Sequence, residues 1–118
     1  QQDAVERVKV VGRELRRIGA KVLPGGDYGF PWNPIGTNAR DLQLFVEWFG
    51  YEPSEVLRAA TALGGEAMGM GEELGQVREG FLADLLLVDG DPTADVAVLA
   101  DKNNLRVIMK DGRLHKSS

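Results

Sequence analysis

One short apolar run lies between two amphipathic segments in the N-terminal part of the chain. The run, residues 20–24, ends at Pro24, which cannot donate a hydrogen bond inside a central strand and so marks its end. A glycine-rich loop, residues 25–29, then leads to a second helix. The order helix, strand, loop and helix is typical of a parallel α/β sheet. Parallel strands are normally buried on both faces, so we expect this lone βα unit to fold against further polypeptide.

The spacing of apolar residues predicts three helices. Apolar positions three or four apart over residues 5–18 predict an amphipathic helix. A second helix is expected to begin at Asn38, a favourable N-cap residue, and to end at Gly50. A third is expected to begin at Pro53, where the missing N–H costs nothing. The pair Gly64–Gly65 is expected to break or kink it.

The character of the sequence changes after Leu74, where short β-type runs replace helical spacing. Asp111-Gly112 is a strong signal for a two-residue hairpin turn. We therefore predict two domains, residues 1–73 from an α/β unit and residues 74–118 from a β-rich unit. The expected strands are residues 75–77, 83–88, 105–110 and 113–116.

Composition excludes several classes of function. The net charge of −4 argues against a nucleic-acid partner, and the absence of cysteine excludes disulfides and thiolate chemistry. No apolar run has the length of a membrane span, and no signal peptide is visible, so we expect no membrane partner and a cytoplasmic location. The chain opens with Gln1 and has no initiator methionine. Its single histidine, His115, is expected to be an exposed residue, so a site with several imidazoles needs residues from elsewhere.

Asp27 is the candidate catalytic and metal-binding residue. It lies just past the expected strand, where catalytic residues collect in α/β barrels. Two interpretations stay open: a turn residue whose carboxylate bonds its own backbone, or a metal ligand and general base. A lone carboxylate does not hold a transition metal tightly, so other ligands would come from elsewhere. Phe30 and Trp32 in the same loop either pack that loop or form a wall for an apolar substrate.

Two other patterns do not indicate ligand sites. The carboxylates Asp84, Asp89, Asp91 and Asp95 do not have the spacing of a calcium loop, and Asp91 precedes a proline in a turn. The glycine-rich stretch of residues 64–75 lacks the Gly-Lys-Ser/Thr ending of a phosphate-binding loop.

Several stretches resemble the C-terminal end of metal-dependent amidohydrolases. The most specific is residues 75–92, GQVREGFLADLLLVDGDP. It is similar to the family signature G-x-[IV]-x-x-G-x-x-A-D-[LI] followed by a D-G-D-P turn. Gly26-Asp27 with the loop to residues 37–42, residues 54–61 and the ending at residues 107–113 are also similar to the family. The nearest subgroup is imidazolonepropionase-like, with prolidase-like and phenylurea-hydrolysing members.

The resemblance implies a fold and a site. The α/β fold would be the last βα unit of a (β/α)8 TIM-type barrel together with the C-terminal strands of the family's β-sandwich. Asp27 would be the family's aspartate at the end of the eighth strand, touching the metal and shuttling a proton. The Thr or Ser that usually precedes it is Gly26 here. The family's His-x-His pair, bridging Lys or Glu and two later histidines would precede residue 1. Asp84 would be structural, its carboxylate satisfying turn amides.

The resemblance also implies a function for the full protein. It would hydrolyse an amide, carbamate or urea C–N bond through a metal-activated water, with one or two divalent ions, zinc being expected. The expected partners are the upstream remainder of the barrel, on the same gene product or a companion chain, a small-molecule substrate, and further copies in a homo-oligomer. We expect the isolated chain to bind no metal and to be inactive. The alternative is a non-catalytic docking or assembly module in which Asp27 only shapes a turn.

Overall fold

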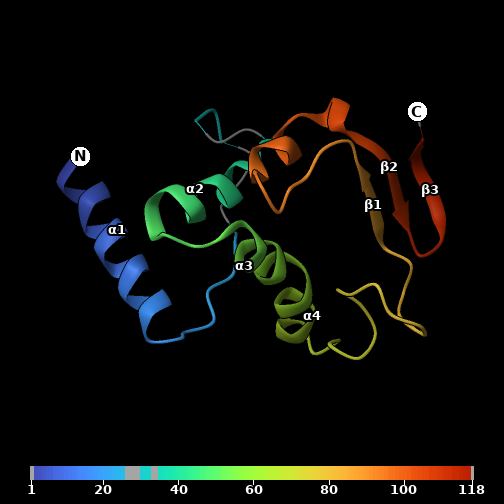
Figure 1. The fold of residues 1–118 in the computed structure, drawn as a ribbon, viewed down its shortest axis with the longest axis horizontal. Coiled ribbons are helices and arrows are strands. Elements are labelled where there is room, and N and C mark those ends of the chain that lie inside the picture. The colour runs from blue at the N-terminus through green and yellow to red at the C-terminus, as the bar shows by residue number, and fades with distance from the viewer. Residues whose placement is uncertain (1, 26–29, 33–34, 118) are drawn as a thin grey trace.

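The computed structural model describes residues 2–25, 30–32 and 35–117. The α-helices precede the strands along the chain, and α1 lies at the far end of the molecule from the sheet (Figure 1). The helices are α1 (Gln2–Arg17), α2 (Arg40–Phe49), α3 (Pro53–Arg58) and α4 (Gly64–Ala67). The strands are β1 (Leu85–Val88), β2 (Leu105–Lys110) and β3 (Arg113–Ser117). The boundary between domains at residue 73 stays a prediction.

The ends of α2 and α3 follow the residues that the sequence offers. Gly50 adopts φ 74°, a left-handed conformation that favours glycine, and its N–H bonds the carbonyl of Phe45. Pro53 opens α3, as predicted. Glu52 and Glu55 form a reciprocal capping box there, each side chain accepting from the other's backbone N–H. These contacts satisfy amides that a helix start otherwise leaves without partners.

The sequence predicted a break or a kink at Gly64–Gly65; the break is wrong, and the kink stays a prediction. A π-helical turn, Ala59–Leu63, joins α3 to α4, and the helical path continues through both glycines. Gly65 is instead needed for close packing, because a Cβ there would lie 2.7 Å from the carbonyl oxygen of Leu74. Gly75 has φ 94° and a hypothetical Cβ only 2.6 Å from the Thr61 carbonyl oxygen. The glycines therefore let the loop after α4 lie against the helix.

The core of the helical part is small. It is built on the buried side chains Phe45, Tyr51 and Val56, with the half-buried Val22, Leu42, Val46 and Phe49 packed around them. Phe45 stacks edge-on against Phe49, with ring centroids 5.3 Å apart. Burial of the Tyr51 ring raises the pKa of its hydroxyl.

Helix α1 reaches this core through one glycine and two arginines. Gly12 is buried, and a Cβ there would fall 2.2 Å from the Phe49 ring. Arg13 donates to the carbonyl of Trp48 at 3.0 Å. Arg16 donates to Glu55 at 2.6 Å, and this hydrogen bond lowers the pKa of the Glu55 carboxyl. Thus α1 contacts α2 through Gly12 and Arg13 and is joined to α3 through Arg16.

Two expected strands do not form. Residues 20–24 and residues 75–77 have no strand conformation in the described chain. A parallel strand needs a neighbour to complete its ladder, and the described sheet offers none beside residues 20–24. Val77 is 86% exposed and follows the left-handed Gly75, so no ladder forms there either.

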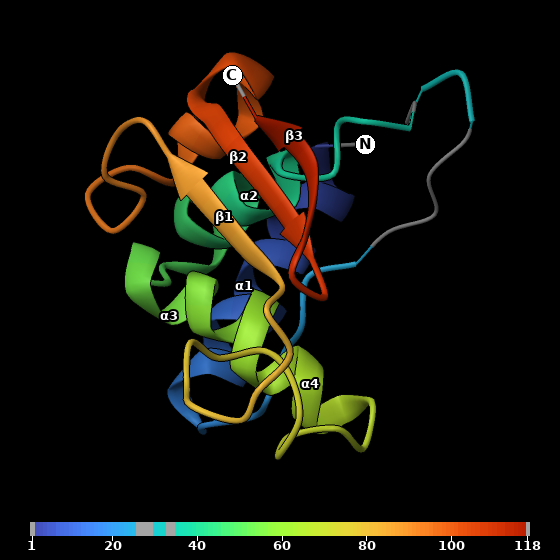
Figure 2. The same cartoon turned by 90° about the vertical axis from the view of Figure 1, so that its right-hand side faces the viewer.

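The three strands form an antiparallel sheet in the order β1-β2-β3. Leu86 pairs with Ile108, and Met109 pairs with Leu114. The β2–β3 turn lies at Asp111-Gly112, as predicted, with φ 48° and 76°. Figure 2 looks onto this sheet with the helices behind it.

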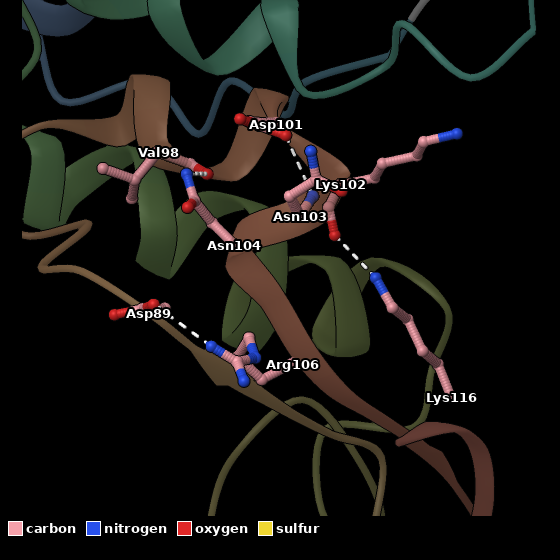
Figure 3. A network of polar contacts seen from close by, with 8 residues as sticks. All are labelled: Asp89, Val98, Asp101, Lys102, Asn103, Asn104, Arg106 and Lys116. Carbon is pink, nitrogen blue, oxygen red and sulfur yellow. Dashed lines mark hydrogen bonds and ion pairs between the residues drawn. The ribbon is translucent and has the colours of Figure 1, made fainter. Parts of the chain in front are cut away.

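Polar contacts hold the short 3₁₀ helices Val96–Ala100 and Lys102–Asn104 against the sheet (Figure 3). The Asn104 amide donates to the Val98 carbonyl at 3.0 Å, and the Lys116 ammonium donates to the Lys102 carbonyl at 2.6 Å. The first 3₁₀ helix also contacts α2, and its Val96 is buried. This helix therefore couples the sheet to the helical part.

Large apolar faces stay uncovered by the described residues. The stripe expected to face inward on α1 is open, with Val8 47% and Val11 57% exposed. Leu86 and Leu87 point to opposite faces of β1 and are 54% and 60% exposed. The accessible surface is 8351 Å², whereas a compact protein of this mass exposes about 6300 Å². The radius of gyration is 15.2 Å, against about 13.5 Å for a compact domain of this length.

Candidate functional site

Asp27 lies outside the described residues, so its assignment as catalytic residue and metal ligand stays a prediction. The structure describes the chain on either side of it, up to Gly25 and again from Phe30. It also describes α2, into which this loop leads. These elements form the frame of the candidate site.

The start of α2 differs from the predicted one. The helix begins at Arg40 with Ala39 as its N-cap residue, and no side chain caps it. The backbone amides of Arg40 and Asp41 bond the carbonyls of Thr37 and Asn38, both at 3.1 Å. The Asn38 side chain instead accepts from the backbone N–H of Gly36 at 3.2 Å. Asn38 therefore shapes the loop before the helix, because the preceding turn already satisfies the helix amides.

A surface groove of ≈ 400 Å³ lies between Gly25 and the start of α2. Of its lining residues only Asp41 carries a charge. The groove begins at the described residue nearest to Asp27 on its N-terminal side. It is lined by Pro24, Gly25, Asn38, Ala39, Asp41, Leu42 and Ala60.

The described residues do not by themselves fit a metal ion. No group of three or more His, Cys, Asp or Glu residues that could hold one occurs among them. His115 lies on β3 and is exposed, as predicted. One groove carboxylate falls short of the three or four protein ligands that catalytic and structural zinc sites use.

Phe30 and Trp32 stack on one another. Their ring centroids are 5.0 Å apart and their planes differ by 9°. Phe30 is 48% exposed and Trp32 78% exposed. This exposure disfavours loop packing against the described body, since a packing residue would be buried. Figure 2 shows the described parts of this segment projecting away from the helices and the sheet.

The acidic residues of the β-rich part are structural in the described chain. The Asp84 carboxylate accepts from the backbone N–H of Asp111 at 2.8 Å and from the Lys110 ammonium at 3.2 Å. These hydrogen bonds lower the pKa of the Asp84 carboxyl, the backbone contact contributing most. Asp91 and Asp95 likewise accept from nearby backbone amides. The prediction that Asp84 satisfies turn amides is confirmed.

The family profile described as "Amidohydrolase family" matches residues 26–115 of this sequence. The match spans most of the chain and includes Asp27. The chain belongs to the amidohydrolase family. The family resemblance predicted from the motifs at residues 75–92 and 107–113 is thus confirmed.

Individual amidohydrolases agree with this assignment. The chain is 36% identical to Aspergillus niger ochratoxinase over 84 residues, which are 70% of this chain and 18% of that protein. It is 33% identical to the imidazolonepropionase of Rubrobacter xylanophilus over 102 residues, 86% of this chain and 25% of that protein. This amidohydrolase chain therefore spans about a fifth to a quarter of the length of these relatives.

Solved amidohydrolase structures match the fold. A Xaa-Pro dipeptidase with bound methionine in its active site superposes with a TM-score of 0.84 at 30% identity, covering 93% of this chain and 26% of that one. The crystal structure of A. niger ochratoxinase gives 0.82 at 29% identity, covering 93% and 25%. The predicted fold class is confirmed, and the mixture of helices and antiparallel strands is that of a part of a larger α/β fold.

The expectation of a metal cofactor is supported in its coarser form. Amidohydrolases are in general metal-dependent. In the described ranges, no helix combines the length and the apolar character that crossing a membrane requires. A cytoplasmic location stays a prediction.

Proposed function

We propose that the full-length protein hydrolyses an amide, carbamate or urea C–N bond and that this chain supplies Asp27 to the reaction. The observation that carries the proposal is the family match over residues 26–115, which begins beside Asp27. The names of the relatives point in the same direction, since ochratoxinase and imidazolonepropionase are enzymes. The comparisons offer no support for the alternative of a non-catalytic docking module.

In this proposal Asp27 acts as a metal ligand and as the general base. Its carboxylate accepts a proton from the attacking water and returns a proton to the departing nitrogen. A positioned base of this kind contributes about 10²–10⁴-fold to the rate. One or two divalent ions, zinc by preference, would supply a bound water with a pKa of about 7. The remaining ligands would come from the upstream part of the barrel.

The upstream part of the barrel is also the proposed partner for the open apolar faces. The exposed stripe at Val8 and Val11 and the exposed β1 residues Leu86 and Leu87 support this. Burial of such apolar surface stabilises the folded protein by about 25 cal/mol for each Å² removed from water. We further propose that the substrate is a small molecule and that the protein is a homo-oligomer.

Hydrolysis assays on the full-length protein before and after metal removal test the proposed function. A panel of N-acyl amino acids, carbamates and phenylureas would be assayed, followed by dialysis against a chelator and stepwise return of Zn²⁺. We expect hydrolysis of at least one class, its loss on dialysis, and its recovery with zinc. Hydrolysis by a protein that elemental analysis shows to be free of metal would contradict the proposal. Inactivity of the wild type towards all three substrate classes would also contradict it.

A further inference from the structure

The loop before α2 presents aromatic surface that the described chain does not use for packing. Trp32 is 78% exposed and Phe30 is 48% exposed. Exposed aromatic surface costs free energy in water, and where it is grouped it commonly marks a binding site. The two rings contact one another, and the described core is built from other aromatic residues, Phe45, Phe49 and Tyr51.

The geometry of the pair suits a flat ligand. The ring planes lie within 9° of parallel at a centroid distance of 5.0 Å, so each ring covers one face of the other. The exposed fraction of Trp32 leaves its indole accessible to a third ring. Offset stacking is a preferred arrangement for aromatic pairs and stabilises a bound aromatic ring beyond the burial of its apolar surface. A saturated ring of the same size gains only the stabilisation from burial.

The position of the pair along the chain brings it within reach of the reaction. Phe30 follows Asp27 by three residues, which span at most about 11 Å of extended chain. A substrate whose ring lies a few bonds from its scissile C–N bond could therefore touch both.

We propose that Phe30 and Trp32 form a stacking shelf that selects amide substrates carrying a flat aromatic ring over substrates with an aliphatic group of equal size. The shelf holds the ring on the exposed indole face of Trp32. This inference rests on the proposed function, because it concerns the substrate of that same site. It assigns a substrate class that the family match leaves open.

The test compares two amides that differ only in a phenyl or a cyclohexyl ring, using the full-length protein. For the wild type we expect a higher kcat/KM with the phenyl substrate. Trp32→Leu should reduce that preference about tenfold, mainly through KM, because it removes the stacking face. Trp32→Phe should retain most of the preference. Ile35→Ala is the matched control, since Ile35 is 80% exposed in the same loop and should leave the preference unchanged.

The outcomes separate this inference from the proposed function. Hydrolysis of both substrates with a preference unchanged in Trp32→Leu would overturn the shelf and leave the proposed function intact. Trp32→Leu could also leave the preference unchanged and give a smaller particle mass than the wild type in light scattering. That result would assign the pair to a subunit interface and would also overturn the shelf. If the wild type hydrolyses neither amide, calorimetric binding of the phenyl compound decides: about tenfold weaker binding in Trp32→Leu supports the shelf, and equal binding overturns it. Phe30→Leu gives a second reading if Trp32→Leu does not fold.

Discussion

The Asp84 carboxylate accepts a hydrogen bond from the backbone N–H of Asp111 at 2.8 Å, across 27 positions of sequence. Beside it, the backbone N–H of Gly112 bonds the Ala83 carbonyl at 3.0 Å. Together these bonds fasten the β2–β3 turn to the start of β1. The Ala-Asp pair of the family signature thus has a structural role in this chain, because it joins the β2–β3 turn to the residues before β1.

Replacing Asp84 with Asn is expected to lower the melting temperature of the full-length protein at pH 7. The hydrogen bonds from Asp111 and Lys110 lower the pKa of Asp84 in the folded state. The stability from this shift is present above the unfolded pKa of about 3.9 and is lost as the pH falls through the lower folded value. The difference in melting temperature between the two proteins should therefore shrink as the pH falls from 7 towards 3.

The matched control for Asp84→Asn is Asp89→Asn. The Asp89 carboxylate makes one exposed contact, to Arg106 at 3.4 Å. Exposed ion pairs contribute little to stability, so its melting temperature should change less. Equal changes for the two variants at pH 7 would contradict the structural use of Asp84.

The adjacent glycines Gly64 and Gly65 should respond to alanine with opposite signs. Gly64 has helical dihedrals and space for a methyl group, so Gly64→Ala should stabilise by about 0.5–1 kcal/mol. At Gly65 the new Cβ would lie 2.7 Å from the backbone oxygen of Leu74, so Gly65→Ala should destabilise by about 1–3 kcal/mol. Chemical denaturation measures both, and effects of the same sign would refute this packing.

Local signals in the sequence predicted the elements that are stabilised locally. Gly50, Pro53 and the Asp111-Gly112 turn each act within a few residues, and the structure places helix ends and the hairpin at them. The failures concern longer-range contacts. Gly65 looked like a helix breaker, but its need for close approach to Leu74 is visible only in three dimensions.

For the candidate site too, local sequence signals predicted some features, whereas the contacts between side chains could not be predicted. Asp27 was predicted from its place after an apolar run and from family resemblance. The strand expected at residues 20–24 does not form, because the described sheet offers it no neighbouring strand. The stacking of Phe30 on Trp32 could not be predicted, because spacing two residues apart does not determine how two rings meet. The groove beside Asp41 could not be predicted either, because its lining residues come from separate parts of the sequence.

The open stripe on α1 leads to a prediction about the upstream polypeptide. If that polypeptide covers Val11, then Val11→Asp places an unpaired charge in a buried contact and should destabilise the full-length protein by about 3–5 kcal/mol. Arg17→Gln on the exposed side of the same helix should change stability little, because Arg17 is 70% exposed. Denaturation midpoints of the two variants test this, and a neutral Val11→Asp would show that the stripe faces water.

The turnover number of Asp27→Asn in the full-length protein tests the central claim most directly. The amide keeps the size of the side chain and removes the base, so we expect kcat to fall by about 10²–10⁴-fold while the melting temperature stays close to that of the wild type. Asp3→Asn, the same chemical change in the first turn of α1, should leave kcat unchanged. An Asp27→Asn protein that turns over within about threefold of the wild type, too small a loss for a general base, would contradict the claim that this carboxylate takes part in the reaction.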